Sequence, residues 1–391
     1  MASDKEKDQL RANLAAVTPV LEQEGAVLSL NAKKTLIVTD IHGNADILDF
    51  ILKFGKEKGV DSYVFLGDYI DKGPDSVGVL NRLFELKLSN PNVALLRGNH
   101  ETTDVSTYGE FRSSVSNEPD LFLSANAAFE NMPIAAVLFG KIFCVHGGLT
   151  ENDSISGISK SDSFGYLWND PFDAKGWTPS PRGSRVKRFG PDVAKTFLKK
   201  NGLQLIIRGH ITLETGVKFW FDKTLVSLYS ALPYSGPDIK AAVCIADSDA
   251  AEFFFYRKDK KKNDFVWESK TSKVLLRPAP VLNESDAGNI CVCGDVGFKK
   301  EETSPEVETV EPENGAEEGN GNGAGNNGDG NGKNSGKTNG NGDKANGNGN
   351  NKKENGKKDV RVPPASKMKS KCKKVMKGKQ KSDKGKWKNK K

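Results

Sequence analysis

The four histidines of this 391-residue chain all stand just after short apolar runs. They are His42, His100, His146 and His210, and they follow TLIVTD, NVALLRGN, KIFCV and LQLIIRG. Apolar runs of this length, rich in β-branched residues, are typical of buried strands. The strand ends of open α/β sheets converge on a ligand site. We therefore expect the four imidazoles to meet at one place in the fold.

Carboxylates and an amide accompany these histidines. Asp40 stands two residues before His42, Asp68 follows YVFLG, and Asn99 directly precedes His100. A carboxylate at the end of a buried strand needs a partner, because burial removes its hydration. For Asp40 and His42 alone, the N-cap of the next helix is a sufficient explanation. The whole set of N and O donors, without thiolate, instead suits two ions of Mn²⁺, Fe or Zn²⁺ that activate a water for in-line attack on phosphorus.

The elements that would position these residues alternate between about residues 33 and 100. The strands TLIVTD, YVFLGD and NVALLRGNH are separated by the helical patterns ADILDFILKFGKEKG and SVGVLNRLFELKL. This βαβαβ order predicts an α/β fold with a mostly parallel sheet and helices on its faces. Residues 104–131 are expected to be helical, and strands dominate from residue 134. Residues 164–192 are expected to form an ordered but irregular loop.

The composition changes in the last third of the chain. Residues 301–350 carry ten acidic and three basic side chains, and residues 351–391 carry three acidic and eighteen basic ones, whereas the preceding part sums to about −1. Asn and Gly make up 25 of the 37 residues in 314–350, so this part has almost nothing apolar to bury. We expect a catalytic domain over residues 1–280. Residues 281–391 are expected to be a disordered tail that is acidic, then Asn/Gly-rich, then Lys-rich.

The bulk composition also bears on compartment and partners. The five cysteines are scattered without an even framework, which argues against a disulfide scaffold. The charged N-terminal sequence MASDKEKDQL has no apolar signal region, and no apolar run approaches the length of a membrane span. We expect a cytoplasmic or nuclear protein. The polybasic end suits nucleic acid, acidic proteins or anionic lipid, and equally suits a solvated linker or pairing with the acidic segment.

In chain order, the motifs D-x-H, GD-x-x-D-x-G, GNHE, HGG and GH resemble those of the phosphoprotein phosphatase family of serine/threonine phosphatases. The resemblance spans about residues 30–280 and includes RGNHE, PIAAV, KIFCVHGGL, LWNDP and VLLRPA. It implies a metallophosphoesterase β-sandwich flanked by helices and a centre of two divalent metal ions. It also implies hydrolysis of phosphoserine and phosphothreonine in phosphoproteins, with regulatory subunits as partners.

The same resemblance implies a role for each site residue. Asp40, His42 and Asp68 would hold one metal ion. Asp68 would bridge to the second ion, which is completed by Asn99, His146 and His210. His100 would be the general acid, oriented by Asp71. The phosphate-contacting residues would be Lys72, Arg182 and Tyr234.

This sequence departs from the family pattern at several of these positions. Thr39 stands where a glycine is usual, Lys72 where an arginine is usual, and Leu232, Pro233 and Ser235 change the surroundings of the tyrosine. Lysine keeps the positive charge but lacks the bidentate fork of arginine. Arg185 competes with Arg182 for the role of the family's phosphate-binding arginine. The changed loop leaves the sensitivity to natural-product toxins open.

Three functions therefore fit the sequence. The first is a metal-dependent protein serine/threonine phosphatase. The second is a phosphoesterase of the same fold that acts on dinucleoside polyphosphates or other small phosphates. The third is a non-catalytic protein with a nucleic-acid-binding tail. The segments PSPRGSR and SALPYSG favour the first over the second, and the complete set of metal-binding positions argues against the third.

Overall fold

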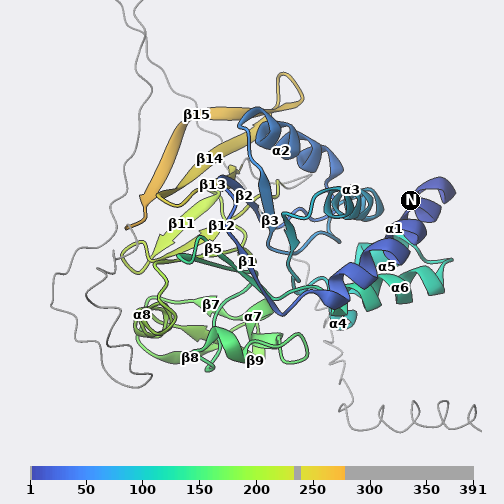
Figure 1. The fold of residues 1–391 in the computed structure, drawn as a ribbon. Coiled ribbons are helices and arrows are strands. Elements are labelled where there is room, and N and C mark those ends of the chain that lie inside the picture. Colours follow the sequence, from blue (N-terminus) through green and yellow to red (C-terminus); the bar gives the residue numbers. More distant parts are fainter. Residues whose placement is uncertain (1, 233–238, 278–391) are drawn as a thin grey trace, which may run out of the picture. The chain divides into compact units, whose positions relative to one another are not determined.

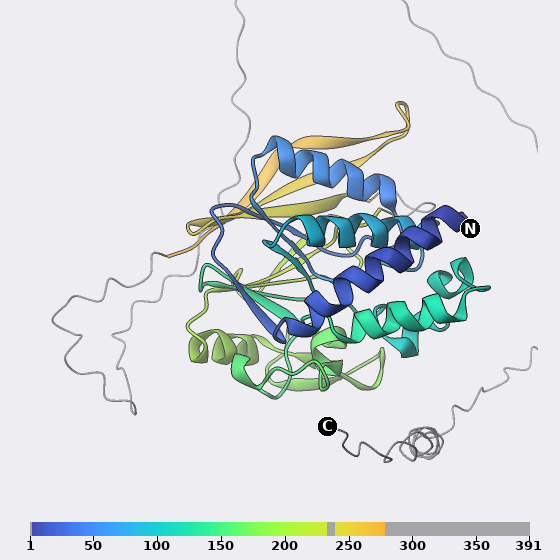
Figure 2. The ribbon, with the colours of Figure 1, turned by 45° about the vertical axis from the view of Figure 1, so that its right-hand side comes forward.

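The computed structural model describes residues 2–232 and 239–277. In this part of the chain two six-stranded sheets pack face to face, and helices cover the outer side of each sheet (Figures 1 and 2). The predicted β-sandwich flanked by helices is confirmed. The predicted tail over residues 281–391 lies outside the described residues.

The first sheet has the strand order β15-β14-β13-β2-β3-β4. Its parallel half is the predicted βαβαβ unit, which consists of β2 (Thr35–Val38), α2 (Ala45–Glu57), β3 (Ser62–Phe65), α3 (Ser76–Ser89) and β4 (Val93–Leu95). Its other half is antiparallel and consists of β13 (Ala241–Ala246), β14 (Ala250–Asp259) and β15 (Asp264–Leu275). The expectation of a mostly parallel sheet is therefore wrong, because short hairpin connections at the end of the described chain allow only antiparallel neighbours.

The second sheet has the order β1-β5-β6-β10-β12-β11. Its strands are β1 (Val27–Leu30), β5 (Ala135–Leu138), β6 (Ile142–Val145), β10 (Leu205–Arg208), β12 (Leu225–Leu228) and β11 (Val217–Trp220). The three central strands β6, β10 and β12 are parallel to one another. Their carboxyl ends therefore lie at one edge of the sheet, where the following residues meet.

Residues 164–192 form regular structure, so the expectation of an irregular loop is wrong. They contain α7 (Phe164–Trp168), a three-stranded sheet of β7 (Asp170–Pro171), β9 (Gly183–Phe189) and β8 (Trp177–Ser180), and the start of α8 (Pro191–Lys200). The prolines that suggested a loop occupy permitted places. Pro171 and Pro179 lie on the two outer strands of this small sheet, and Pro191 begins a helix.

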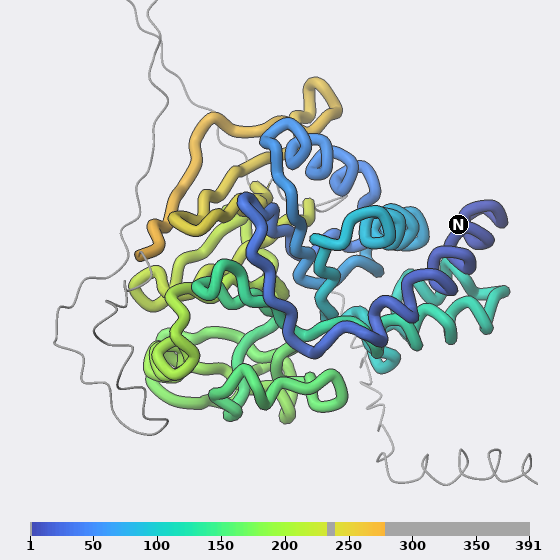
Figure 3. Tube along the Cα trace, viewed as in Figure 1, coloured from blue at the N-terminus to red at the C-terminus, as the bar shows by residue number. Residues whose placement is uncertain are grey.

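Helix α1 (Asp4–Gln23) was not predicted, although its signals are in the sequence. Ser3 and Glu6 form a capping box, in which Ser3 N–H donates to the Glu6 carboxylate at 2.7 Å. Its buried apolar face has helical spacing and comprises Leu10, Leu14, Val17 and Leu21. This face packs against α3 and α6 (Pro119–Glu130), and Figure 3 shows the N-terminal segment running alongside both.

The remaining helical segments are short. The region expected to be helical, 104–131, contains α4 (Thr103–Ser106), α5 (Glu110–Ser114) and α6, so that expectation is confirmed with two interruptions. A 3₁₀ turn, η1, covers Ile155–Gly157. None of the helices in the described part of the chain combines the length and the hydropathy of a membrane span.

Successive side chains along each strand point to opposite faces of its sheet. With two sheets packed face to face, the buried apolar side chains form three layers. On β2, Leu36 and Val38 face the layer shared with α1, α2 and α3, whereas Ile37 faces the layer between the two sheets. Cys144 and Cys244 also lie in this middle layer as free, fully buried thiols. Because both faces of the central strands are buried, their sequences are continuous apolar runs that can end in polar residues only at the sheet edge.

The packing of α1 predicts the effect of one substitution. Leu10→Ala should destabilise the protein by about 2–5 kcal/mol, because the fully buried Leu10 side chain would leave a cavity against α3 and α6. Urea denaturation followed by circular dichroism measures the difference. Leu123→Ala on α6 is the control, since that side chain is 63% exposed and should change stability by less than about 0.5 kcal/mol. If Leu10→Ala lowered the free energy of unfolding no more than Leu123→Ala does, the packing of Leu10 would not contribute to stability.

Candidate active site

The polar residues that follow the parallel strands lie together at one edge of the sandwich. Asp40 and His42 follow β2, Asp68 follows β3, and the remaining members, Asn99, His100, His146 and His210, follow β4, β6 and β10. The imidazole rings form two pairs: the ring centres of His42 and His100 are 4.9 Å apart, and those of His146 and His210 are 5.1 Å apart. The structure thus brings all four histidines of the protein into one site.

The turns that carry these side chains have unusual backbone geometry. Ten described non-glycine residues have positive φ, and five of them belong to the site: His42, Asp68, Asp71, Lys72 and His210, with φ between 48° and 66°. Each left-handed residue other than glycine costs about 1–2 kcal/mol. Such strain persists only where the surrounding structure enforces it, and it is concentrated at functional sites.

Two glycines allow the turns after β3 and β4 to touch. A Cβ atom on Gly67 would lie 2.3 Å from the backbone nitrogen of Gly98, and one on Gly98 would lie 2.3 Å from the nitrogen of Asp68. Neither position can hold a side chain without moving the backbone. This close approach sets the separation between Asp68 and the loop that carries His100.

Asp68 is the centre of the site, because its carboxylate lies between two imidazoles. Its Oδ1 is 3.3 Å from Nε2 of His146, and its Oδ2 is 3.6 Å from Nε2 of His42. Both rings donate from Nδ1 to backbone carbonyls, His42 to Ile70 at 3.0 Å and His146 to Leu66 at 2.9 Å. In this tautomer each Nε2 presents a lone pair to a carboxylate oxygen. A cation between these acceptors would satisfy both of them.

Around Asn99 and His210, further oxygen and nitrogen atoms also lie close together. Asn99 Oδ1 lies 3.0 Å from His146 Nε2 and 2.8 Å from His210 Nδ1. His210 Nε2 is buried without a hydrogen-bond partner in the described part of the chain. Asp40 is fixed by the His210 backbone N–H, which donates to its Oδ2 at 3.1 Å. Asn99 Oδ1, His146 Nε2 and His210 Nδ1 thus lie close enough together to share one ion.

These donors fit a pair of divalent cations. Two groups place their ligand atoms within 4.8 Å of one another: His42, Asp68 and His100, and Asp68, His146 and His210. Asp68 belongs to both groups, as a bridging carboxylate would. Burial lowers the pKa of His42 and lowers that of His210 strongly, which keeps both imidazoles neutral and able to bind a metal ion.

His100 is held differently from the other three histidines. Its Nδ1 donates to Asp71 Oδ2 at 2.8 Å, and Phe111 N–H donates to the other oxygen of Asp71 at 2.9 Å. Burial opposes the charge of His100, but Asp68 and Asp71 outweigh this effect and raise its pKa to about 9. Its other ring nitrogen, Nε2, lies 4.0 Å from Asp68 Oδ2. A proton carried on this nitrogen is therefore placed for donation into the site.

Glu101 is a site residue that the sequence analysis did not single out. It is fully buried and accepts backbone N–H groups of Asp68 at 2.7 Å, Tyr69 at 2.9 Å and Gly98 at 3.0 Å. Glu101 thereby ties the turns after β3 and β4 together. Burial and the charge of Asp68 raise the pKa of Glu101 to about 8, and cations bound at Asp68 would offset this repulsion. The signal was available, since a glutamate directly follows the GNH motif in an otherwise buried loop.

Lys72 reaches into the metal-binding half of the site. Its Nζ lies 2.7 Å from Nε2 of His42, and its backbone N–H donates to Glu110 Oε2 at 2.8 Å. The ammonium thus approaches the lone pair that a metal ion would use. Because one lone pair serves one cation, an ion bound by His42 requires Lys72 to turn away from this nitrogen.

The two competing arginines of the PSPRGSR segment have different partners. Arg182 Nε donates to Asp170 Oδ2 at 2.7 Å, and the other oxygen of Asp170 accepts from the fully buried Arg208 at 2.8 Å. The guanidinium of Arg185 instead lies 4.0 Å from the ring centre of Phe164. Arg208 stands two residues before His210, so the ion pairs connect Arg182 to the metal-binding edge. Tyr234 lies outside the described residues.

Thr39 has a structural use that a glycine could not supply. Its backbone N–H donates to Ser230 Oγ at 3.0 Å, and Ser230 N–H donates to Thr39 Oγ1 at 3.1 Å. This reciprocal pair joins the end of β2, next to Asp40, to the segment that follows β12.

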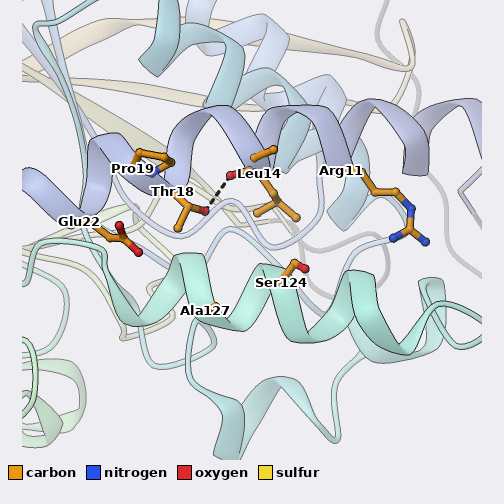
Figure 4. Close-up of a pocket in the computed structure, with 8 residues that line it drawn as sticks. Arg11, Leu14, Thr18, Pro19, Glu22, Ser124 and Ala127 are labelled. Carbon is orange, nitrogen blue, oxygen red and sulfur yellow. Dashed lines mark hydrogen bonds between the residues drawn. The ribbon is translucent and has the colours of Figure 1, made fainter. Parts of the chain in front are cut away.

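A separate groove lies between α1 and α6, away from the polar site. It encloses about 470 Å³ and is lined by Arg11, Leu14, Ala15, Thr18, Pro19, Glu22, Ser124 and Ala127 (Figure 4). Thr18 Oγ1 donates to the Leu14 carbonyl at 2.7 Å within α1. The lining offers no cluster of histidines or carboxylates, so the groove does not compete with the polar site for catalysis.

Comparison with known proteins agrees with this geometry. A family model described as calcineurin-like phosphoesterase matches residues 33–212. The serine/threonine-protein phosphatase 6 catalytic subunit of Drosophila melanogaster is 33% identical in an alignment of 247 residues that covers 58% of this chain and 80% of the relative. A Saccharomyces cerevisiae protein serine/threonine phosphatase with similarity to human phosphatase PP5 superposes with a TM-score of 0.56 at 27% identity, over 61% of this chain and 82% of the other.

The fold is that of a calcineurin-like metallophosphoesterase. Within that class, the chain belongs to the phosphoprotein phosphatase family of serine/threonine phosphatases. The resemblance inferred from the sequence motifs is thus confirmed.

The contact between Asp71 and His100 predicts a change in pH dependence. If His100 must be protonated, activity is present below its pKa and is lost as the pH rises through that value. Asp71→Asn removes a negative charge that raises this pKa, so the alkaline limb of kcat should move about 1–3 pH units lower. Steady-state kinetics across the pH range, beside metal analysis, measure the shift. An alkaline limb that stays in place, with metal content unchanged, would mean that His100 does not govern it.

Proposed function

We propose that this protein is a metal-dependent phosphatase that hydrolyses phosphoserine and phosphothreonine in protein substrates. The observation that carries the proposal is the position of His100. Its Nδ1 is fixed by Asp71, and its Nε2 lies 4.0 Å from the carboxylate of Asp68. A serine or threonine alkoxide is a poor leaving group, so its departure requires a proton donor at this place.

Two divalent metal ions, with Mn²⁺ as the first candidate and Fe or Zn²⁺ as others, would complete the site. One would be held by Asp40, His42 and Asp68. The other would be held by Asp68, Asn99, His146 and His210. When bound, such ions lower the pKa of a water and neutralise phosphoryl charge. The lowered pKa values of His42 and His210, and the closeness of Asn99 Oδ1 to His146 Nε2 and His210 Nδ1, support this assignment.

The phosphoryl group would be held by three side chains around this centre. Lys72 supplies a mobile positive charge next to His42, and Arg182 supplies a guanidinium oriented by Asp170. Tyr234 is the third proposed contact. His100 would then transfer its proton to the leaving oxygen, and Asp71 would stabilise the ring orientation during that transfer.

The proposed catalytic domain comprises residues 1–280, and the tail after it is proposed to be dispensable for the chemistry. All proposed ligands except Tyr234 lie on the two packed sheets and their connections. Binding of nucleic acid or acidic proteins by the polybasic end, regulatory subunits, and a cytoplasmic or nuclear location stay predictions from the sequence.

A comparison of substrates tests the proposed function. The metal-loaded full chain should hydrolyse a phosphoserine peptide well and diadenosine tetraphosphate poorly. Chelation should abolish the activity, and added Mn²⁺ should restore it. The variant that lacks residues 301–391 should retain most of the activity, because the motifs end before that segment. Preference for the dinucleotide would assign the protein to the small-molecule phosphoesterases, and inactivity on both would indicate a non-catalytic role.

The proton-donor role of His100 can be separated from a metal-binding role. His100→Asn should lower kcat on an alkyl phosphate by about 10²–10⁴, the usual contribution of general acid catalysis. The loss should be smaller on an aryl phosphate, whose leaving group needs no proton. Kinetics on both substrates and metal analysis decide between the roles. Loss of metal, or equal losses on both substrates, would place His100 among the metal ligands.

A further inference from the structure

The hairpin formed by β8 and β9 presents four basic side chains beside the site. Three of them have polar partners in the described structure. Arg182 pairs with Asp170, Lys187 pairs with Glu151 at 2.9 Å, and Arg188 donates from Nε to the Pro179 carbonyl at 3.0 Å. Arg185 is the fourth. Its side chain is exposed, and in the part of the chain that the structure describes it makes no ion pair with a carboxylate.

Arg185 is nevertheless held in place. Its guanidinium lies 4.0 Å from the ring centre of Phe164, which is half-buried at the start of α7. A guanidinium stacked on an aromatic ring keeps its N–H groups at the edge, available for a planar acceptor. Asp162, two residues before Phe164, forms no ion pair with Arg185 among the described contacts. The positive charge of Arg185 is therefore both oriented and available.

A row of aromatic contacts connects Arg185 to the metal-binding edge. Phe164 stacks on Trp168 with ring centres 6.0 Å apart, and Trp168 meets His210 edge-to-face at 5.4 Å. Because these contacts join end to end, the Arg185 guanidinium lies within about 15 Å of the His210 ring. An extended peptide advances about 3.3–3.6 Å per residue. Arg185 therefore lies no more than about four residues of an extended substrate away from His210.

We propose that Arg185, stacked on Phe164, forms a second anion subsite of the enzyme. It would bind an acidic side chain or a second phosphate located within about four residues of the phosphoserine or phosphothreonine that reacts. Carboxylates and phosphates share the planar pair of acceptors that a guanidinium binds through two parallel hydrogen bonds. This inference rests on the proposed function, and it narrows the substrates to phosphopeptides with acidic or multiply phosphorylated surroundings.

Three matched phosphoserine peptides test the proposal on the metal-loaded full chain. The first has alanine at the four positions on each side of the phosphoserine, the second has glutamates there, and the third has one further phosphoserine. The ratio of kcat/KM between an anionic peptide and the alanine peptide should exceed one for the wild type. In Arg185→Ala this ratio should fall about fivefold to tenfold, and in Arg185→Glu it should fall further. Arg185→Lys should retain part of the preference, because it keeps the charge but loses the fork.

Lys218→Ala is the matched control. Lys218 also lies over an aromatic ring, with its Nζ 3.3 Å from the centre of Trp220, but it stands on the outermost strand β11 of the second sheet. Its loss should leave the ratio unchanged. Circular dichroism would confirm that all variants are folded.

The outcomes separate the subsite from the proposed function. A preference for both anionic peptides that depends on Arg185 supports a general anion subsite, and a preference for the doubly phosphorylated peptide alone assigns it to phosphate.

An unchanged ratio in Arg185→Ala, or no preference in the wild type, overturns the subsite while phosphatase activity persists. Equal losses on all three peptides in Arg185→Ala overturn it as well, since Arg185 would then serve the reacting phosphate. Inactivity of the wild type on every peptide would instead overturn the proposed function.

Discussion

The structure depends on one arrangement, in which the carboxylate of Asp68 lies between the Nε2 atoms of His42 and His146 inside the protein. Its oxygens face lone pairs at 3.6 and 3.3 Å, and Glu101 adds a second buried acid. Such a set is unfavourable in a medium that solvates charge poorly. It becomes favourable once cations lie among the acceptors, so the fold and the metal centre stabilise each other.

The sandwich supplies the rigidity that this arrangement requires. Five site residues sit in left-handed conformations, and Gly67 and Gly98 bring two turns into direct backbone contact. Neither feature would persist on a flexible loop, because each is strained or closely packed. The turns are short and directly follow buried strands. The side chains of these strands are fixed in an apolar layer on each face of their sheet. The strain is thus carried by the packing of the strands rather than by the site residues themselves.

The parts of the fold that the sequence predicted are those with a repeating physical signal. Apolar runs that end in Asp40, Asp68 or His146 implied strands whose ends converge, and the structure brings these residues together. Helix α1 was missed although its capping box and the spacing of its apolar residues are in the sequence. The small sheet within 164–192 was missed because its strands are short or contain proline, which gives weak periodicity. Glu101 was missed for a different reason. Its role comes from backbone N–H groups of Asp68 and Tyr69 in the turn after β3 and of Gly98 in its own turn, so the GNHE motif marks the residue but not the contacts that it makes.

Lys72 shows how one substitution relative to the family keeps the positive charge but changes where it is directed. The ammonium of Lys72 lies 2.7 Å from Nε2 of His42, so a compact cation already stands next to this imidazole. An arginine would spread its charge over a planar fork and could not direct it at a single lone pair in the same way. The flexible stem of lysine allows the ammonium to leave this nitrogen when a metal ion binds there. The positive charge of Lys72 then remains at the edge of the proposed metal site, where the oxygens of a phosphoryl group would lie.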